Sequence, residues 1–349
     1  MKSSKSAQIE VSFNWIFVLI AGAAILFFFI RVIGSETEFA ESASHARAVS
    51  RMNSVITALK QNPDSVSVQD RLNFEIEFEC TVEGQSYGIR NSNARETLPH
   101  EIVFTPQKIG SSRLVAWVKT FNAPFPVSST LYLTDEQTKY VFLTDGDANN
   151  RVSYFYNQFP RNISKELTTL LEFKQRGDEG YREYILIISE DQADQNFGFS
   201  TDDRRALASK INSVIYIDEN TNEIVFHELK NDLNYLDVTP SRKQYFTEES
   251  IIGAIISGNP ELYECAMNKV LDHIKISAEI NLERIKKIRT AYGSDHSCYS
   301  MYSPTIAQDF FENLAQASQN KNYENIRQHA RSIEALNNQL RRSPCIQIY

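Results

Sequence analysis

An uninterrupted apolar stretch near the N-terminus, Phe13–Ile33, constrains this chain more than any other feature. Its first 18 residues, up to Arg31, carry no charge, and apart from Asn14 they are apolar or small. Roughly 20 helical residues span the hydrocarbon core of a bilayer. A secretory signal would have a shorter apolar region followed by a small-residue cleavage site. We therefore expect one N-terminal transmembrane helix, with residues 13–33 contacting the lipid bilayer.

The basic residues that flank this stretch set the expected orientation. Lys2 and Lys5 precede it and Arg31 follows it, which slightly favours a cytoplasmic N-terminus under the positive-inside rule. We expect a single-pass cell-membrane protein with the bulk of the chain extracytoplasmic. Arg47 and Arg51 lie on the far side and reduce the asymmetry. The alternative is a reversed topology, in which the chain is a cytosolic scaffold.

Composition narrows the classes of partner and cofactor. The formal net charge of −8 argues against nucleic acid, because a basic face is needed to neutralise phosphates. The chain has no P-loop, GxGxxG, HExxH or GxSxG motif and no Cys/His cluster of the kind that binds zinc. No cofactor is therefore predicted. Four cysteines, an even number, are compatible with two disulfides in an oxidising compartment.

Local patterns divide the chain into four segments. Residues 1–34 are the tail and anchor, 35–62 a juxtamembrane stalk helix, 63–240 a β-rich and then α/β globular domain, and 241–349 a C-terminal helical region. Ser35 and Glu38 have the spacing of a capping box, and Asn62-Pro63 ends the stalk helix. The expected fold class is α+β with a βαβ-type central sheet, an antiparallel β region, the N-terminal transmembrane helix and a C-terminal helical bundle or hairpin.

The periodicity of apolar residues places the strands of the globular domain. Period-2 alternation predicts antiparallel strands. Beyond Lys139, short apolar runs separated by helical patterns predict βαβ units with a buried parallel core. The antiparallel strands are expected at Leu72–Cys80, Glu101–Thr105, Arg113–Lys119 and Thr130–Leu133. The α/β part is expected to contain strands Tyr140–Leu143, Tyr184–Ile188 and Val214–Ile217, helices Ser164–Phe173 and Asp202–Ile211, and a hairpin to Ile224–Phe226.

The last hundred residues have helical patterns with clear start signals. Asn259-Pro260-Glu261 combines an N-cap, a proline at the first helical position and an acid in the first turn, which predicts a helix to about Tyr292. Two further helices are expected over Thr305–Ser318 and Tyr323–Arg342.

This helical arrangement bears on the cysteine pairing. Cys265 and Cys298 lie near opposite ends of a helix roughly 45 Å long, whereas bonded cysteines need Cα atoms about 4.4–6.8 Å apart. If the chain turns near Gln319, the last helix returns toward Cys298. The pairs Cys298–Cys345 and Cys80–Cys265 then follow. If the last helix is unbroken, this pairing fails.

The residues before the apolar stretch resemble a known signal. Lys5-Ser6-Ala7-Gln8-Ile9-Glu10, followed by the stretch itself, resembles the class III signal of archaeal type IV pilin-like membrane proteins. The resemblance implies cleavage between Ala7 and Gln8 and an apolar helix that packs in an assembly. An uncleaved signal anchor is the alternative.

One run after an apolar strand resembles an enzyme motif. VFLTDGDAN resembles the first motif of haloacid-dehalogenase-like phosphatases, and Ser189, which ends YILIIS, can stand for the second. The resemblance implies Asp145 as nucleophile and Asp147 as general acid, and paired carboxylates at such a position can hold Mg²⁺. The alternative is an ordinary Asp/Gly/Asn turn.

Two functional hypotheses follow from these patterns. The first is a membrane-anchored surface or envelope protein, pilin-like or otherwise, whose extracytoplasmic domain binds other proteins or itself and is not an enzyme. The second is a membrane-tethered Mg²⁺-dependent phosphohydrolase that uses Asp145 and Asp147.

Overall fold

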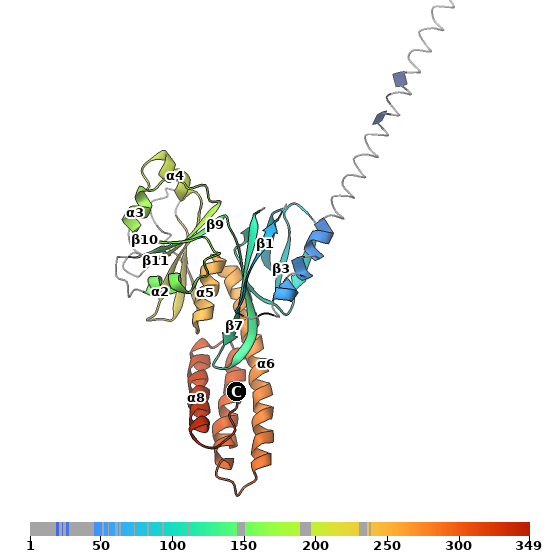
Figure 1. The fold of residues 1–349 in the computed structure, drawn as a ribbon, viewed down its shortest axis with the longest axis vertical. Coiled ribbons are helices and arrows are strands. Elements are labelled where there is room, and N and C mark those ends of the chain that lie inside the picture. The colour runs from blue at the N-terminus through green and yellow to red at the C-terminus, as the bar shows by residue number, and fades with distance from the viewer. Residues whose placement is uncertain are drawn as a thin grey trace, which may run out of the picture.

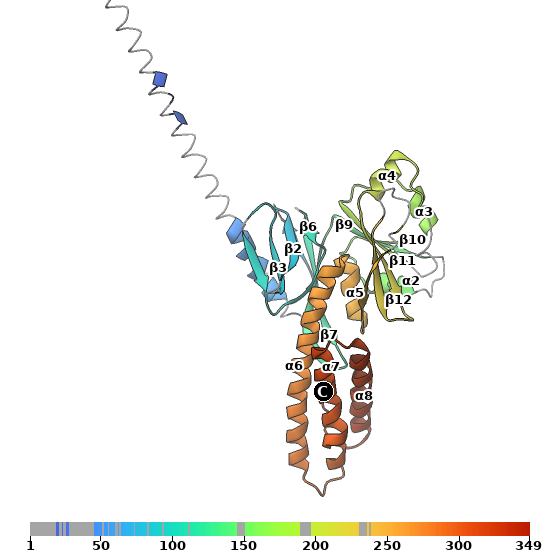
Figure 2. The same ribbon diagram turned by 180° about the vertical axis from the view of Figure 1, so that it is seen from behind.

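The computed structural model shows three parts joined by one long helix (Figure 1). The structure describes residues 19, 20, 23, 26, 27 and 45–349, except 51, 55, 60, 61, 63, 73, 82, 83, 93, 111, 145–150, 189–196, 230–235, 237 and 238. A β-rich part comes first, an α/β part lies beside it, and a helical bundle projects away from both (Figures 1 and 2).

The β-rich part contains two four-stranded sheets. Strand order in the first is β1 (Val66–Arg71), β7 (Arg113–Asn122), β8 (Pro126–Asp135) and β5 (Ile102–Phe104). In the second it is β4 (Arg95–Leu98), β3 (Gly84–Ile89), β2 (Ile76–Thr81) and β6 (Lys108–Ile109). All pairs except β5–β8 are antiparallel. The strands predicted over residues 113–119 and 130–133 are confirmed as β7 and β8, and the one over 72–80 as β2, which begins only at Ile76. The predicted antiparallel strand over 101–105 is β5, but its predicted direction is wrong, because β5 pairs in parallel with β8. The structure adds β1, β3, β4 and β6.

Alternation along β7 lets one strand serve two cores. Leu114, Ala116 and Val118 join the core of the β-rich part, while Val115 and Trp117 on the opposite face join the central core. Helical residues among 45–59 add Val49, Met52 and Ile56 to the first of these cores. The described part of the expected stalk helix therefore packs against the globular domain.

The α/β part is built on one six-stranded sheet. Its order is β10 (Lys165–Thr168), β9 (Thr138–Leu143), β11 (Glu183–Ile188), β12 (Ile211–Asp218), β13 (Glu223–His227) and β14 (Ser241–Gln244). The first four strands are parallel and the last two antiparallel. Both faces are buried, as predicted: Phe142 and Ile187 face the central core, and Val141 and Leu186 face a second cluster.

The helices of this part differ from the predicted ones in two places. The structure has α2 (Arg151–Gln158), α3 (Leu170–Gln175) and α4 (Asp202–Ala208). The predicted helix Ser164–Phe173 is wrong over its first half, because residues 165–168 form β10, which pairs with β9. The predicted helix Asp202–Ile211 is confirmed as α4 but ends earlier.

The C-terminal region is helical, as predicted. It contains α5 (Glu248–Ser257), α6 (Pro260–Tyr292), α7 (Asp309–Gln319) and α8 (Tyr323–Arg342), with short helical turns at Tyr299–Tyr302 and Pro304–Gln308. The Asn259 side chain accepts hydrogen bonds from the amides of Glu261 (3.0 Å) and Leu262 (2.9 Å) and so fixes the start of α6.

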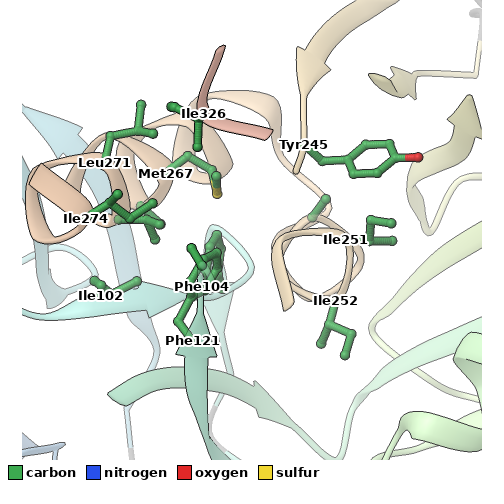
Figure 3. Packing of buried hydrophobic residues seen from close by; sticks show 14 of the residues in the cluster. Ile102, Phe104, Phe121, Tyr245, Ile251, Ile252, Met267, Leu271, Ile274 and Ile326 are labelled. Atoms are coloured by element: carbon green, nitrogen blue, oxygen red, sulfur yellow. The ribbon is translucent and has the colours of Figure 1, made fainter. Parts of the chain in front are cut away.

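The central core lies where the three parts meet. Figure 3 shows Ile251 and Ile252 on α5, Met267, Leu271 and Ile274 on α6, and Ile102, Phe104 and Phe121 on the neighbouring strands. The tip between β7 and β8 reaches the bundle, where the Phe125 ring lies 5.8 Å from that of Phe311 and 5.7 Å from that of Tyr349. Aromatic contacts therefore hold the bundle to the body.

A buried ion pair joins all three sheets. The carboxylate of Asp135, which has no exposed surface, accepts hydrogen bonds from Arg182 Nη1 (2.8 Å), the Gly110 amide (2.7 Å), and the Gln137 amide and Thr138 hydroxyl (each 3.0 Å). Arg182 also donates to the Lys108 carbonyl at 2.9 Å. One carboxylate thus ties the end of β8 to the starts of β9 and β11 and to the chain after β6.

One part of the expected fold class is wrong. Among the described helices, none combines the length and the apolar character needed to cross a membrane, so the single N-terminal transmembrane helix is not supported. The longest of them, α6, has 33 residues but carries charged side chains throughout. The prediction depended on residues 13–33, of which only 19, 20, 23, 26 and 27 are described.

Candidate functional site

The carboxyl edge of the six-stranded sheet is where sequence analysis places a site. From β9 the chain crosses to β10 on one side and then to β11 on the other, so the strand order reverses at β9. In open α/β sheets, ligands bind at the carboxyl ends of the strands at such a point. Phe142 pairs with Ile187, so β9 and β11 end side by side. Asp145, Asp147 and Ser189 follow these ends in sequence but lie outside the described residues.

The described groups beside these strand ends are engaged in local hydrogen bonds. The Thr144 amide donates to the Thr168 carbonyl at 2.9 Å. Thr169 and Glu172 form a capping box at the start of α3, and the Thr168 hydroxyl also donates to Glu172, at 2.9 Å. The Thr169 backbone amide, helped by the Thr168 hydroxyl, lowers the pKa of Glu172 from its ordinary value. This carboxylate therefore caps a helix and stays ionised.

A second polar cluster lies between α2, α5 and the end of β12. Arg151 Nε is 2.8 Å from a Glu219 carboxylate oxygen, and Arg151 Nη2 is 3.7 Å from Glu248. The Tyr154 hydroxyl donates to Glu248 at 2.5 Å, which raises the pKa of Tyr154. The guanidinium also lies over the Tyr154 ring, 5.0 Å from its centroid.

Sequence analysis did not find this cluster. Its members come from three separate segments and have no common motif, so only the fold brings them together. Within the described ranges, no group of three or more His, Cys, Asp or Glu side chains has the arrangement of a metal site.

Two polar pockets are present in the described part of the molecule. One, of about 580 Å³, lies at the amino edge of the parallel strands, and its lining includes Arg113, Glu136, Gln137 and Glu179. The other, of about 480 Å³, lies at the far end of the helical bundle, and its lining includes Lys286, Arg289, Tyr299 and Gln308. Arg113 and Glu136 pair at 2.9 Å in the first pocket, so two of its charges are already matched.

The predicted disulfides are confirmed. Cys80 bonds Cys265 with a Cα–Cα distance of 5.9 Å, and Cys298 bonds Cys345 with 5.8 Å. The first joins β2 to the first turns of α6. The second joins the loop after α6 to the segment after α8. The predicted signal residues Ala7 and Gln8 lie outside the described residues.

Comparison with family models, curated proteins and solved structures finds no match for this chain. Any function must therefore be argued from the molecule itself.

Proposed function

We propose that this chain is an extracytoplasmic surface or envelope protein that assembles with a second copy of itself through the projecting helix α6. The observation that carries this proposal is a pair of exposed isoleucines one turn apart on α6. Ile276 is 53% exposed and Ile280 is 64% exposed. Single exposed apolar residues are common, but two adjacent ones on a projecting helix favour a protein contact.

The charges around these isoleucines favour a second copy as the occupant. Asp272, His273, Glu283 and Arg284 lie on the same side of α6 as Ile276 and Ile280, by helical spacing. In an antiparallel pair whose two-fold axis crosses the exposed face of α6 midway between Ile276 and Ile280, Ile276 faces Ile280 of the second copy. Asp272 then faces Arg284, and His273 faces Glu283. A parallel pair would instead place each charge opposite itself.

The two disulfides support the proposed compartment. Disulfides persist mainly in oxidising environments such as the extracytoplasmic space. They also bracket α6: one bond fixes its first turns to the β-rich part, and the other joins the loop after α6 to the segment after α8 at the far end of the bundle. Such a helix presents its outer face in a fixed position relative to the body, which suits an assembly surface.

Sedimentation velocity of the oxidised full chain tests the proposal. We expect a concentration-dependent dimer that Ile276→Glu weakens by at least about tenfold, since each buried isoleucine contributes about 1.5–3 kcal/mol. Leu171→Glu is the matched control, because Leu171 is 66% exposed on α3.

A charge swap distinguishes this interface from non-specific association. Asp272→Arg places two arginines face to face and should weaken the dimer, and the double variant Asp272→Arg/Arg284→Asp should restore it. A chain that is monomeric at all concentrations, or a double variant as weak as the single one, contradicts the proposal.

A phosphohydrolase is the second candidate, favoured by the side-by-side ends of β9 and β11. The motif resemblance implies Asp145 as nucleophile and Asp147 as acid. The test is hydrolysis of p-nitrophenyl phosphate in the presence of Mg²⁺, with Asp145→Asn as the variant. Activity that Asp145→Asn leaves unchanged, or no activity, removes this candidate.

A further inference from the structure

The pocket at the far end of the helical bundle has the chemistry of an anion site. It lies where α6 ends and the chain turns back toward α7, at the tip of the part that projects from the body (Figures 1 and 2). Its volume of about 480 Å³ falls within the range of small-molecule sites. Two basic side chains, Lys286 and Arg289, line it, and no carboxylate is among the described side chains of its wall.

Arg289 has an unused hydrogen-bond donor in this pocket. Its Nε is buried and has no hydrogen-bond partner. Its guanidinium is held over the Tyr299 ring, 4.4 Å from the centroid. Leaving a buried donor unpaired costs about 1–3 kcal/mol, and more for a charged group. Because Nε has almost no accessible surface, an acceptor in the pocket pairs with it only if the side chain turns toward the pocket.

Lys286 adds a second positive charge that is only weakly engaged. Its ammonium lies 2.8 Å from Glu283 on the same helix, and the two side chains are 45% and 64% exposed. Exposed pairs of this kind contribute at most about 1 kcal/mol, so an anion in the pocket can compete for the ammonium. Basic residues in the last turns of a helix are ordinary. What distinguishes this pair from that ordinary arrangement is the pocket that both residues line, with Arg289 held over the Tyr299 ring and no carboxylate among the described lining residues.

The wall opposite α6 is fixed in place. Tyr299 follows Cys298, which is fully buried and bonded to Cys345. Gln308, 8% exposed, donates to the Tyr302 carbonyl at 3.2 Å. A preformed site of this kind loses little entropy when it binds a ligand.

We propose that this pocket binds an oxyanion, a carboxylate or a phosphate, between the Arg289 guanidinium and the Lys286 ammonium. Both anions present paired oxygens, which match the planar donor fork of arginine. This proposal does not require the proposed self-association, although both use Glu283, which pairs with Lys286 beside the pocket and faces His273 of the second copy in the dimer. The site would serve recognition of an anionic ligand at the bundle tip.

Calorimetric titration of the oxidised full chain with sodium phosphate, and separately with sodium acetate, tests the site. Ionic strength is kept constant with sodium chloride, so that general screening does not change. We expect saturable binding of at least one anion, and the anion that binds more tightly identifies the ligand as phosphate-bearing or carboxylate-bearing.

Variants then assign the binding to the pocket. Arg289→Met should weaken binding by at least about tenfold, because a charge-assisted hydrogen bond is lost. Lys287→Met removes the same charge one residue after Lys286, but Lys287 does not line the pocket. This variant should therefore change the affinity for the anion by less than about twofold. Arg289→Lys keeps the positive charge but loses the planar guanidinium, so it should bind the anion with an intermediate affinity. This result would show that the weaker binding of Arg289→Met comes from the lost charge and hydrogen bond, and not from misfolding.

Two results would overturn the proposal. One is the absence of saturable binding for both anions. The other is a loss in Lys287→Met as large as that in Arg289→Met, which would mean that the anions respond only to overall charge.

Discussion

The most direct test of the fold is the buried carboxylate of Asp135. Asp135→Asn keeps the size of the side chain but replaces one oxygen with an NH₂ group. If Oδ1 stays an acceptor for Gln137 and Thr138, the new NH₂ faces the Gly110 amide and Arg182 Nη1. Two donors then lose their acceptor, and the Arg182 guanidinium keeps the longer ion pair of its Nε with Glu183, at 3.4 Å.

The size of the effect follows from burial. Breaking a buried ion pair by removing one partner costs about 3–5 kcal/mol. The Arg182 side chain keeps 27% of its surface exposed whereas Asp135 has none, so water can solvate part of the remaining charge. We therefore expect the lower end of that range, about 3 kcal/mol, from Asp135→Asn.

Urea unfolding followed by tryptophan fluorescence measures this loss, because Trp117 is buried on β7, the strand that pairs with β8. The matched control is Glu136→Gln, one residue away. Glu136 pairs with Arg113, whose side chain is 59% exposed, so the change should cost less than about 1 kcal/mol. Equal losses in the two variants would refute the view that Asp135 organises the junction.

Three further predictions concern packing, pH and the disulfides. A Cβ at Gly253 would lie 2.6 Å from the buried Phe104 ring, so Gly253→Ala should lower the free energy of unfolding by about 1–3 kcal/mol. Urea unfolding measures this loss. Gly177→Ala is the control and should not lower it, because a Cβ at Gly177 would meet nothing within 4 Å. Because the folded pKa of Glu172 is below its ordinary value of 4.5, its stabilising contribution is present above pH 4.5 and is lost as the pH falls through the folded pKa. The stability difference between the parent protein and Glu172→Gln should therefore disappear in strong acid, and a difference independent of pH would contradict the assignment. The Cys80–Cys265 bond closes a separation of 185 residues, and in the chain-entropy model its removal should lower the free energy of unfolding by about 5 kcal/mol. The Cys298–Cys345 bond closes a separation of 47 residues, and its removal should lower it by about 4 kcal/mol. Thermal unfolding of the two variants in which both cysteines of a bond are replaced by serine tests this order.

Local signals were sufficient for the elements that depend on local chemistry. The Asn259-Pro260 start predicted α6, and the length of α6 with the turn after α7 predicted both disulfides. Alternation predicted β2, β7 and β8 and the position, although not the direction, of β5, and short apolar runs predicted the parallel core.

Elements decided by distant partners were not predictable in this way. Residues 165–168 resemble a helix start but form β10, because β9 offers a free edge for parallel pairing. Residues 151–158 are rich in aromatic residues with modest helix propensity, so α2 gave no signal. The Arg151–Glu219–Glu248 cluster joins segments far apart in the chain. The transmembrane prediction was drawn from the length and apolar character of residues 13–33, of which only five are described, and no described helix supports it.

Arg289 and the two exposed isoleucines lie on opposite sides of α6, which gives a final prediction. Nine residues separate Ile280 from Arg289, and at 3.6 residues per turn they place Arg289 about half a turn away from Ile280. An antiparallel dimer through Ile276 and Ile280 therefore uses the face of α6 opposite Arg289, and the two Arg289 side chains lie toward opposite ends of the helix pair. Ile280→Glu should weaken the dimer in sedimentation velocity yet bind phosphate or acetate as the parent protein does, and Arg289→Met should show the reverse. If either variant impaired both measurements while its melting temperature stayed unchanged, the two surfaces would have to overlap, and the antiparallel geometry inferred from Asp272 and Arg284 would be wrong.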